Sequence, residues 1–248
     1  MNERVCVVIP VYRGAGVLAR ALDSALRQPE AGQVIVVNDC SPDDIDAVMA
    51  PYLSDSRILY LKNEKNMGAA ESRNRGVRAA TGKYVAFLDA DDRWLPGKLA
   101  VQLELLEKTG SVLCATGREL MHPDGTSTGR TIGMPEKVTY KDLLKHNCIA
   151  CSSVVLLREV ALEFPMHHAS DSHEDYILWL EILKKYGTAV GIDTPLLQYT
   201  VSDTGKSGSK LNSALMTLRV YRYMGFGPVK SLACFISYAI QGVKKYYL

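Results

Sequence analysis

Uninterrupted apolar runs, separated by stretches of helical spacing, limit the fold of this chain more than any other feature. Strands with one exposed face alternate apolar and polar residues, whereas unbroken runs are typical of strands buried on both faces. Their alternation with helical stretches indicates an α/β fold with a Rossmann-like, mostly parallel sheet flanked by helices. The predicted strands are Val5–Ile9, Val34–Val37, Ile58–Leu61 and Tyr84–Leu88.

Polar side chains gather directly after these predicted strands. Ligands of such sheets bind beyond the carboxyl ends of the strands, so the residues that follow each run are the candidate contacts. They are Pro10-Val11-Tyr12, Asn38-Asp39, Asn63 to Asn66, and Asp89-Ala90-Asp91-Asp92. Three of the four segments contain Asp or Asn, a pattern that does not by itself name a function.

The helices are predicted from periodicity and capping. Asp and Ser favour helix starts, and Gly favours helix ends, so these residues set the boundaries. The predicted helices are Val17–Leu26, one capped by Ser41-Pro42-Asp43-Asp44, Ala69–Ala80, one near Trp94–Leu106, Glu174–Tyr186, Asn212–Tyr223 and Val229–Tyr247. A hairpin or loop is expected around Pro123-Asp124-Gly125, a short strand at Val154–Leu157 and a polar loop from Val201 to Ser209.

Composition excludes several classes of protein. The 248 residues carry a formal net charge of +2, so no overall basic field argues for nucleic acid. No apolar stretch reaches the roughly 18 residues of a membrane span, and the N-terminal run is strand-like rather than a signal peptide. A cytoplasmic protein is therefore expected. The six cysteines are scattered and are interpreted as free thiols rather than zinc ligands.

The acidic segment at Asp89-Ala90-Asp91-Asp92 has two interpretations when taken alone. Clustered carboxylates repel unless a cation or hydrogen bonds compensate, and carboxylates with water and phosphate suit Mg²⁺ or Mn²⁺. Carboxylates also commonly stabilise the start of a helix. The surrounding sequence decides between the two interpretations.

A longer stretch resembles family-2 glycosyltransferases of the GT-A fold. The stretch begins with Asn66-Met67-Gly68 and continues through Arg73-Asn74-Arg75-Gly76. It then contains Thr81-Gly82-Lys83-Tyr84 and ends in Leu88-Asp89-Ala90-Asp91-Asp92. This order is similar to the family's N-x-G-x-x-x-x-R-N-x-G, A-x-G-x-Y and L-D-x-D-D segments. Val8-Ile9-Pro10-Val11-Tyr12 resembles its first strand and turn, and Val36 to Asp43 resembles its V-D-D-G-S-x-D segment. Asn38 and Cys40 depart from that pattern, which leaves the choice of nucleobase open.

The resemblance implies a role for each segment. Asp39 would accept a hydrogen bond from uracil, while Pro10, Val11 and Tyr12 would pack on the base or ribose. Asn66 and Arg73 would contact the base or diphosphate, although without the motif an ion pair on a helix surface is the simpler interpretation of Arg73. Asp91 would hold the metal, Asp89 the ribose or metal, and Ala90 would lie against the donor. The implied cofactors are Mg²⁺ or Mn²⁺ and a nucleotide-sugar, most simply a UDP-sugar.

A base for the acceptor hydroxyl is expected from the second half of the chain. His173-Glu174-Asp175-Tyr176 resembles the family's E-D motif, which makes Asp175 the first candidate base and Glu174 the second. An acidic helix start is the alternative. His167 and His168 are weaker candidates. Lys206, in a Thr204 to Ser209 loop, could touch a phosphate.

The resulting hypothesis is an inverting glycosyltransferase that acts in surface polysaccharide biosynthesis. The expected organisation is a GT-A domain over 1–210, with a nucleotide half at 1–95 and an acceptor half at 96–210, and a helical extension over 211–248. A non-catalytic nucleotide-sugar-binding protein is the alternative. A nucleotidyltransferase fits less well because Pro10 and Tyr12 stand where its Gly-rich loop belongs.

The expected partners are the nucleotide-sugar and a saccharide or lipid-linked acceptor, without nucleic acid. Aromatic and basic residues are dense over 219–248, which predicts either a peripheral contact with the inner face of an anionic membrane or packing on the catalytic domain or a second subunit. The sugar, the linkage and the oligomeric state do not follow from the sequence.

Overall fold

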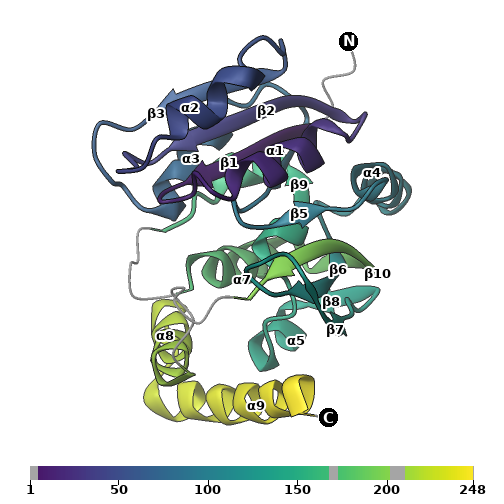
Figure 1. Cartoon of the computed structure of the whole chain (residues 1–248). Coiled ribbons are helices and arrows are strands. Elements are labelled where there is room, and N and C mark those ends of the chain that lie inside the picture. The colour runs from purple at the N-terminus through teal and green to yellow at the C-terminus, as the bar shows by residue number, and fades with distance from the viewer. Residues whose placement is uncertain (1–4, 168–172, 202–209, 248) are drawn as a thin grey trace.

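The protein is described by a computed structural model that covers residues 5–167, 173–201 and 210–247. The side chains of 210–213 and 241–247 lie outside the description, although the helices that contain them are included. Strands and helices alternate over the first half and are less regular beyond it (Figure 1).

Ten strands of the described residues form one sheet. They are β1 (Val5–Val11), β2 (Ala31–Asn38), β3 (Ile58–Lys62), β4 (Tyr84–Phe87), β5 (Arg93–Trp94), β6 (Leu113–Met121), β7 (Ser127–Ile132), β8 (Lys137–Thr139), β9 (Val155–Leu157) and β10 (Thr188–Thr200). The order is β3-β2-β1-β4-β9-β6-β10-β5, with β7 on β6 and β8 on β10. One continuous sheet therefore joins the two halves of the chain.

The sheet changes character along this order. Strands β3, β2, β1 and β4 are all parallel, as expected for strand–helix repeats. Strand β9 then pairs antiparallel with both β4 and β6, while β6 and β10 are parallel to each other. The expected parallel sheet is thus confirmed for the first half, and the second half is mixed.

Helices cover both faces of the sheet. They are α1 (Leu18–Leu26), α2 (Ile45–Met49), α3 (Ala69–Ala79), α4 (Lys98–Thr109), α5 (Tyr140–Lys145), α6 (Arg158–Glu163), α7 (Glu174–Tyr186), α8 (Lys210–Tyr223) and α9 (Pro228–Tyr247), with 3-10 turns at Ala50–Tyr52 and Cys151–Ser153. Asp44 caps α2 by accepting a hydrogen bond from the Ala47 backbone N–H, as its position in the sequence predicts.

Two buried clusters explain the unbroken apolar runs. Cys6 and Val8 of β1 point to one face, where α3 and α7 pack, and Val5, Val7 and Ile9 point to the other, where α1 and α4 pack. Because both faces of β1 are covered, every residue of the strand is buried.

Close packing of α3 on β1 depends on Gly76. A Cβ atom added at Gly76 would lie 2.3 Å from the Cγ1 atom of Val8, which no relaxed side chain tolerates. The missing Cβ lets α3 approach the sheet closely, and α3 carries Arg73 on a buried surface.

One expectation about local structure needs correction, and one strand was not expected. The helix predicted near Trp94 begins only at Lys98, because Trp94 pairs with Leu197 of β10 as part of the short strand β5. The long strand β10 was not predicted. The predicted hairpin is confirmed, with β6 and β7 flanking a turn at Gly125 that has φ +88°.

The C-terminal helices lie at the lower end of the molecule in Figure 1. Partly buried Phe235 and Tyr238 of α9 pack against the cluster that contains α7. Within the described residues, no helix combines the length and apolarity needed to span a bilayer. The expected division at residue 210 stays a prediction.

Candidate active site

The acidic segment after β4 is held in place by two residues far away in the sequence. The backbone N–H of Asp89 donates to the hydroxyl oxygen of Ser152 over 3.0 Å. The Asp92 carboxylate is buried and accepts the Thr200 backbone N–H over 2.8 Å, and the Thr200 hydroxyl donates to the Asp91 carbonyl over 2.6 Å. The turn from 89 to 92 is therefore tied to both β10 and the 3-10 turn before β9.

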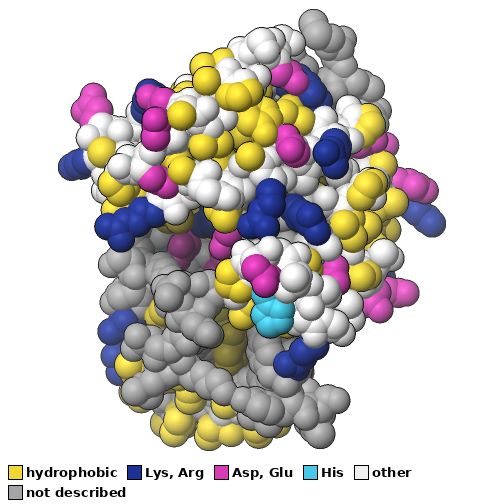
Figure 2. Space-filling model, viewed as in Figure 1, with side chains coloured by type: hydrophobic (Ala, Val, Ile, Leu, Met, Phe, Trp, Pro, Cys, Tyr) yellow, Lys and Arg dark blue, Asp and Glu magenta, His cyan; other side chains and the backbone are white. Residues whose placement is uncertain are grey.

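Asp89 is partly buried and Asp91 is exposed, unlike the buried Asp92. Figure 2 shows acidic side chains set back between basic ones below the upper half of the molecule. The Asp91 side chain reaches solvent, and desolvation, followed by the charge of Asp89, raises its pKa to about 6. Arg73 and Arg20 oppose that rise. Burial, then Asp89 and Asp91, also raises the pKa of Asp92.

Arg73 joins this segment to the second acidic motif. Its guanidinium lies 2.5 Å from Asp89 and 3.8 Å from Glu174, and its side chain is only 7% exposed. Its Nε atom is buried and has no hydrogen-bond partner in the described part of the chain. The ion pair that the alternative interpretation expected is present, but its position on a helix surface is wrong, because the Arg73 side chain is buried between the two acidic motifs.

The start of α7 brings Asp175 into the same network. Burial, followed by the charge of Glu174, raises the pKa of Asp175, while His173 and Arg73 oppose the rise. Its Oδ1 atom accepts the Tyr176 backbone N–H over 2.8 Å. A raised carboxyl pKa is one property expected of a general base.

Asp39 organises the loop before α3. Its Oδ1 atom accepts from the Asn63 amide at 2.7 Å and from the Met67 backbone N–H at 2.8 Å, and its Oδ2 atom accepts from the Gly68 N–H at 2.8 Å. A carboxylate offers about four lone-pair positions, so one on Oδ2 remains for a ligand.

The neighbouring turn after β1 has one exposed aromatic ring. Pro10 and Val11 are buried in the strand, whereas Tyr12 is 45% exposed and lies under the Arg13 guanidinium, 5.4 Å from its ring centre. A Cβ atom at Gly14 would meet Val11 at 2.6 Å and Ala90 at 3.6 Å, so this turn packs closely on the acidic segment. Pro10, Val11 and Tyr12 were expected to pack on a nucleotide, and of these three only Tyr12 has an exposed side chain.

The remaining predicted residues form no hydrogen bond or ion pair with the acidic segment in the described part of the chain, or lie outside the described residues. Asn66 is exposed on the loop that Asp39 organises. Lys206 and His168 lie outside the described residues, as does most of the polar loop from Val201 to Ser209. His167 lies 3.3 Å from Glu181 and contacts Tyr223, and neither partner belongs to the two acidic motifs.

Several supporting residues escaped prediction because their contacts are long-range. Ser152 and Thr200 bind the acidic segment, and Asn74 fixes the chain before α7 by bonding both the N–H and the carbonyl of Met166 at 2.8 Å. The only sign in the sequence that Asn74 could matter was its position in the Asn66 to Gly76 segment that resembles the family. Tyr199 is also close enough for Asp92 and Asp89 to raise its pKa further after burial.

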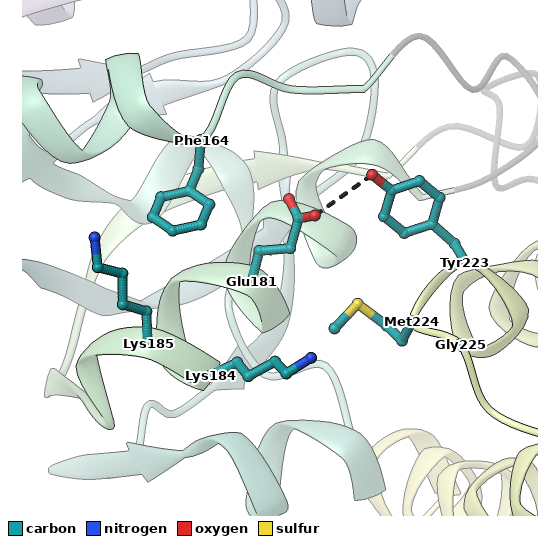
Figure 3. A pocket seen from close by; sticks show the side chains of 7 residues that line it. All are labelled: Phe164, Glu181, Lys184, Lys185, Tyr223, Met224 and Gly225. Atoms are coloured by element: carbon teal, nitrogen blue, oxygen red, sulfur yellow. Dashed lines mark hydrogen bonds between the residues drawn. The ribbon is translucent and has the colours of Figure 1, made fainter.

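Two surface cavities flank these groups. One of about 490 Å³ is lined by Asn63 and Met67, which both bond Asp39, and by Glu64, Lys65, Glu71 and Arg75. The other, of about 540 Å³, lies between α7 and the end of α8, where Tyr223 donates to Glu181 (Figure 3). The second cavity contains none of the acidic residues that follow β4.

The carboxylate pair suits a hard divalent cation. No group of three or more His, Cys, Asp or Glu side chains in the described residues could hold a metal ion. Mg²⁺ and Mn²⁺ at nucleotide sites are commonly held by one or two carboxylates, with phosphate and water supplying the other ligands. Asp91 and Asp89 fit that pattern, and Asp91 is the freer of the two because Arg73 pairs with Asp89.

The family profile described as "Glycosyl transferase family 2" matches residues 6–163, which include the strands, the acidic segment and Arg73. The chain belongs to glycosyl transferase family 2. As a family-2 glycosyltransferase, it has the α/β architecture and the order of motifs that the sequence predicted.

Two relatives match this glycosyltransferase over nearly its whole length. The Bacillus subtilis protein TuaG, named as a teichuronic acid biosynthesis glycosyltransferase, is 36% identical over 97% of this chain and 96% of its own length. The Escherichia coli protein WfgD, named as a UDP-Glc:α-D-GlcNAc-diphosphoundecaprenol β-1,3-glucosyltransferase, is 30% identical over 98% of this chain and 94% of its own length.

Solved structures show the same GT-A fold. Staphylococcus aureus TarS, in complex with UDP-GlcNAc, superposes with a TM-score of 0.72 at 14% identity over 97% of this chain and 73% of its own. The mannosyltransferase PcManGT of Pyrobaculum calidifontis, in complex with GDP-Man and Mn²⁺, gives 0.69 at 16% identity over 94% and 68%.

Proposed function

We propose that this glycosyltransferase moves a hexose or N-acetylhexosamine from UDP to a hydroxyl of a lipid-linked saccharide, with a divalent metal and with inversion, during surface polysaccharide synthesis. The observation that carries the proposal is the contact of Arg73 with both Asp89 and Glu174. That contact supports the proposal because it links Asp89, in the segment proposed for the metal, to Glu174, the neighbour of the proposed base Asp175. WfgD, whose name includes a UDP-sugar and a diphosphoundecaprenol acceptor, supports the donor and acceptor classes.

Asp91 and Asp89 would hold Mg²⁺ or Mn²⁺ at the diphosphate. When bound, the metal supplies positive charge that stabilises the departing nucleoside diphosphate. Ser152 and Thr200 keep the segment in a fixed shape, so the carboxylates need little rearrangement on binding. The Mn²⁺ complex of PcManGT supports this choice of ion.

The donor nucleotide would lie between Tyr12 and Asp39. The remaining lone pair of Asp39 would accept the imide N–H of uracil, and a charged acceptor strengthens such a bond. Tyr12 would stack on the base or ribose from the turn formed by Pro10 and Val11. Asn66, Ala90 and Lys206 remain proposed donor contacts.

Asp175 would act as the general base. Glu174 is engaged by Arg73, whereas burial raises the pKa of Asp175, which makes its carboxylate a stronger proton acceptor. The acceptor oxygen forms a bond to the anomeric carbon as the bond from that carbon to the diphosphate oxygen breaks. The hydroxyl proton passes to the Asp175 carboxylate and the nucleoside diphosphate leaves, which inverts the anomeric centre in one displacement.

The acceptor class also implies work at a membrane surface. A diphosphoundecaprenol-linked substrate, as in the name of WfgD, is anchored in a bilayer. We propose peripheral contact through residues 219–248, with a homodimer through the same residues as the alternative.

The test is release of nucleoside diphosphate from a panel of UDP-, GDP-, dTDP- and CDP-sugars, with Mn²⁺ or with EDTA. We expect metal-dependent release from a UDP-sugar, loss of release in Asp91→Ala, and loss of release with retained donor binding in Asp175→Asn. Glu104→Gln, on the exposed face of α4, is the control for removal of a carboxylate. If no nucleotide-sugar binds in either condition, the proposed donor site is wrong.

A further inference from the structure

Helix α9 exposes a face that consists only of apolar side chains. The face, here called the outer stripe, contains Val229, Leu232, Ala233, Ile236, Ala239 and Ile240. Val229 is 85% exposed, and the Leu and two Ile side chains are each more than half exposed. Their spacing of three and four residues places them on one side of the helix. Hydrophobic side chains also line the lower edge of the molecule in Figure 2, where Figure 1 places α9.

The opposite face of α9 already anchors the helix to the domain. Ser231 is 4% exposed, and the partly buried Cys234, Phe235 and Tyr238 pack on the core. The Tyr238 ring lies 6.1 Å from the rings of both Tyr176 and His146. The outer stripe therefore takes no part in the packing of the described residues. A helix on the surface of a soluble domain normally has a polar outer face, so this apolar face needs an explanation.

The charge of the C-terminal segment that contains the stripe indicates what covers it. Between Arg219 and Leu248 the sequence has five basic residues and no Asp or Glu. They are Arg219, Arg222, Lys230, Lys244 and Lys245. An apolar helix face among cations is typical of helices that lie in the interface of an anionic bilayer. A second copy of the same surface would bring two basic segments together with no acidic residue from either segment to pair with them.

We propose that the outer stripe of α9 is the surface on which this chain rests on an anionic lipid bilayer. The inference builds on the peripheral contact proposed above and specifies its face and orientation. A helix of 20 residues is about 30 Å long, and α9 would lie flat in the interface with the stripe toward the acyl chains.

The test is co-sedimentation with vesicles of phosphatidylcholine alone or mixed with phosphatidylglycerol. The test variant is Leu232→Ser with Ile236→Ser, and the matched control is Leu53→Ser with Val101→Ser, which removes exposed apolar side chains from other elements. We expect the wild type and the control to bind the anionic vesicles. The stripe variant should bind about tenfold less, since each buried CH₂ contributes to the affinity.

Three results would overturn the proposal. They are failure of the wild type to bind anionic vesicles, equal binding by the stripe variant, and a dimer in analytical ultracentrifugation that the stripe variant dissociates. The last result would show that a second copy covers the stripe. Metal-dependent UDP release in solution is measured on the same samples, so a wild type that releases UDP but does not bind anionic vesicles refutes this surface and leaves the proposed function standing.

Discussion

Arg73 forms a 2.5 Å ion pair with Asp89, and the same guanidinium lies 3.8 Å from Glu174. The residue thus connects the end of β4 with the start of α7 through α3. The Arg73 side chain is only 7% exposed, so water cannot easily replace it. Removal of Arg73 would therefore leave both carboxylates without their cation.

Replacement of Arg73 should damage both stability and turnover. Arg73→Ala is expected to lower the free energy of unfolding by about 3 kcal/mol, because buried carboxylates remain without a cation. Arg78→Ala is the control, since its pair with Glu71 is on the same helix but 54% exposed on the Arg side, and it should cost less than about 1 kcal/mol. Urea unfolding measures both changes. Equal losses in the two variants would contradict the network.

The metal-free protein should become more stable as the pH falls from 7 to 5. Burial raises the pKa values of Asp91, Asp92 and Asp175 above those of the unfolded chain, so the folded state binds more protons in this range. A raised carboxyl pKa contributes stability that is lost as the pH rises through the folded value, which is about 6 for Asp91. The measurement is the thermal midpoint in EDTA. Asp91→Asn should make the thermal midpoint depend less on pH. A wild-type midpoint that is lower at pH 5 than at pH 7 would contradict the prediction.

The hydrogen bond between Asp92 and Thr200 should stabilise the fold through the acceptor oxygen of Asp92 more than through its charge. Asp92→Ala leaves the buried Thr200 N–H without an acceptor and should cost about 1–3 kcal/mol, while Asp92→Asn keeps an oxygen in place and should cost less. Urea unfolding in EDTA gives the stability, and Mn²⁺ titration gives the metal affinity. Asp92→Ala should weaken the metal more than Asp92→Asn does. Equal weakening in the two variants would show that the Asp92 charge, which both remove, supports the metal rather than the hydrogen bond to Thr200.

Asp39→Ala should both loosen the loop before α3 and weaken nucleotide binding. Three donors of the chain lose their acceptor, which should cost about 2 kcal/mol or more. UDP affinity in calorimetry should fall by more than about tenfold, equivalent to about 1.4 kcal/mol. Asn63→Ala removes one of these donors but keeps the carboxylate, so UDP binding should change little. A similar loss in both variants would mean that loop order, not the carboxylate, controls binding.

Gly76→Ala should destabilise the fold by about 1–3 kcal/mol, because its new Cβ would clash with Val8 inside the sheet-facing core. Gly16→Ala is the matched control, since a Cβ there has no neighbour within 4 Å. Differential scanning calorimetry compares the two. A neutral Gly76→Ala would show that α3 can move away from β1 without cost.

Local pattern predicted the first half of the fold well. Strands β1 to β4 and helix α3 follow from apolar runs and capping residues, because both signals lie within the segment that they describe. Strand β10 was missed since Gly191, Asp193 and Pro195 interrupt its apolar pattern, and the register with β6 shifts on both sides of Pro195.

The candidate site was predictable only as far as its motifs extend. Asp91, Arg73 and Asp175 lie in recognisable segments, but their mutual placement depends on Ser152, Thr200 and Met166, which are 63 to 108 residues from the positions they contact. No pattern within a short window shows such contacts. The backbone conformation of Cys40 was equally hidden, because its φ of +55°, at a position where the family pattern has Gly, is visible only in the structure.

The hydrogen bond from Thr200 to Asp92 spans 108 positions of the chain. During synthesis, Asp89 and Asp91 therefore emerge from the ribosome long before the strand that shapes their turn. A nascent chain that stops short of β10 has the acidic residues without the geometry that could present them to a metal. Under the proposed function, binding of the metal would therefore follow closure of the second half of the sheet and would come late in the maturation of this enzyme.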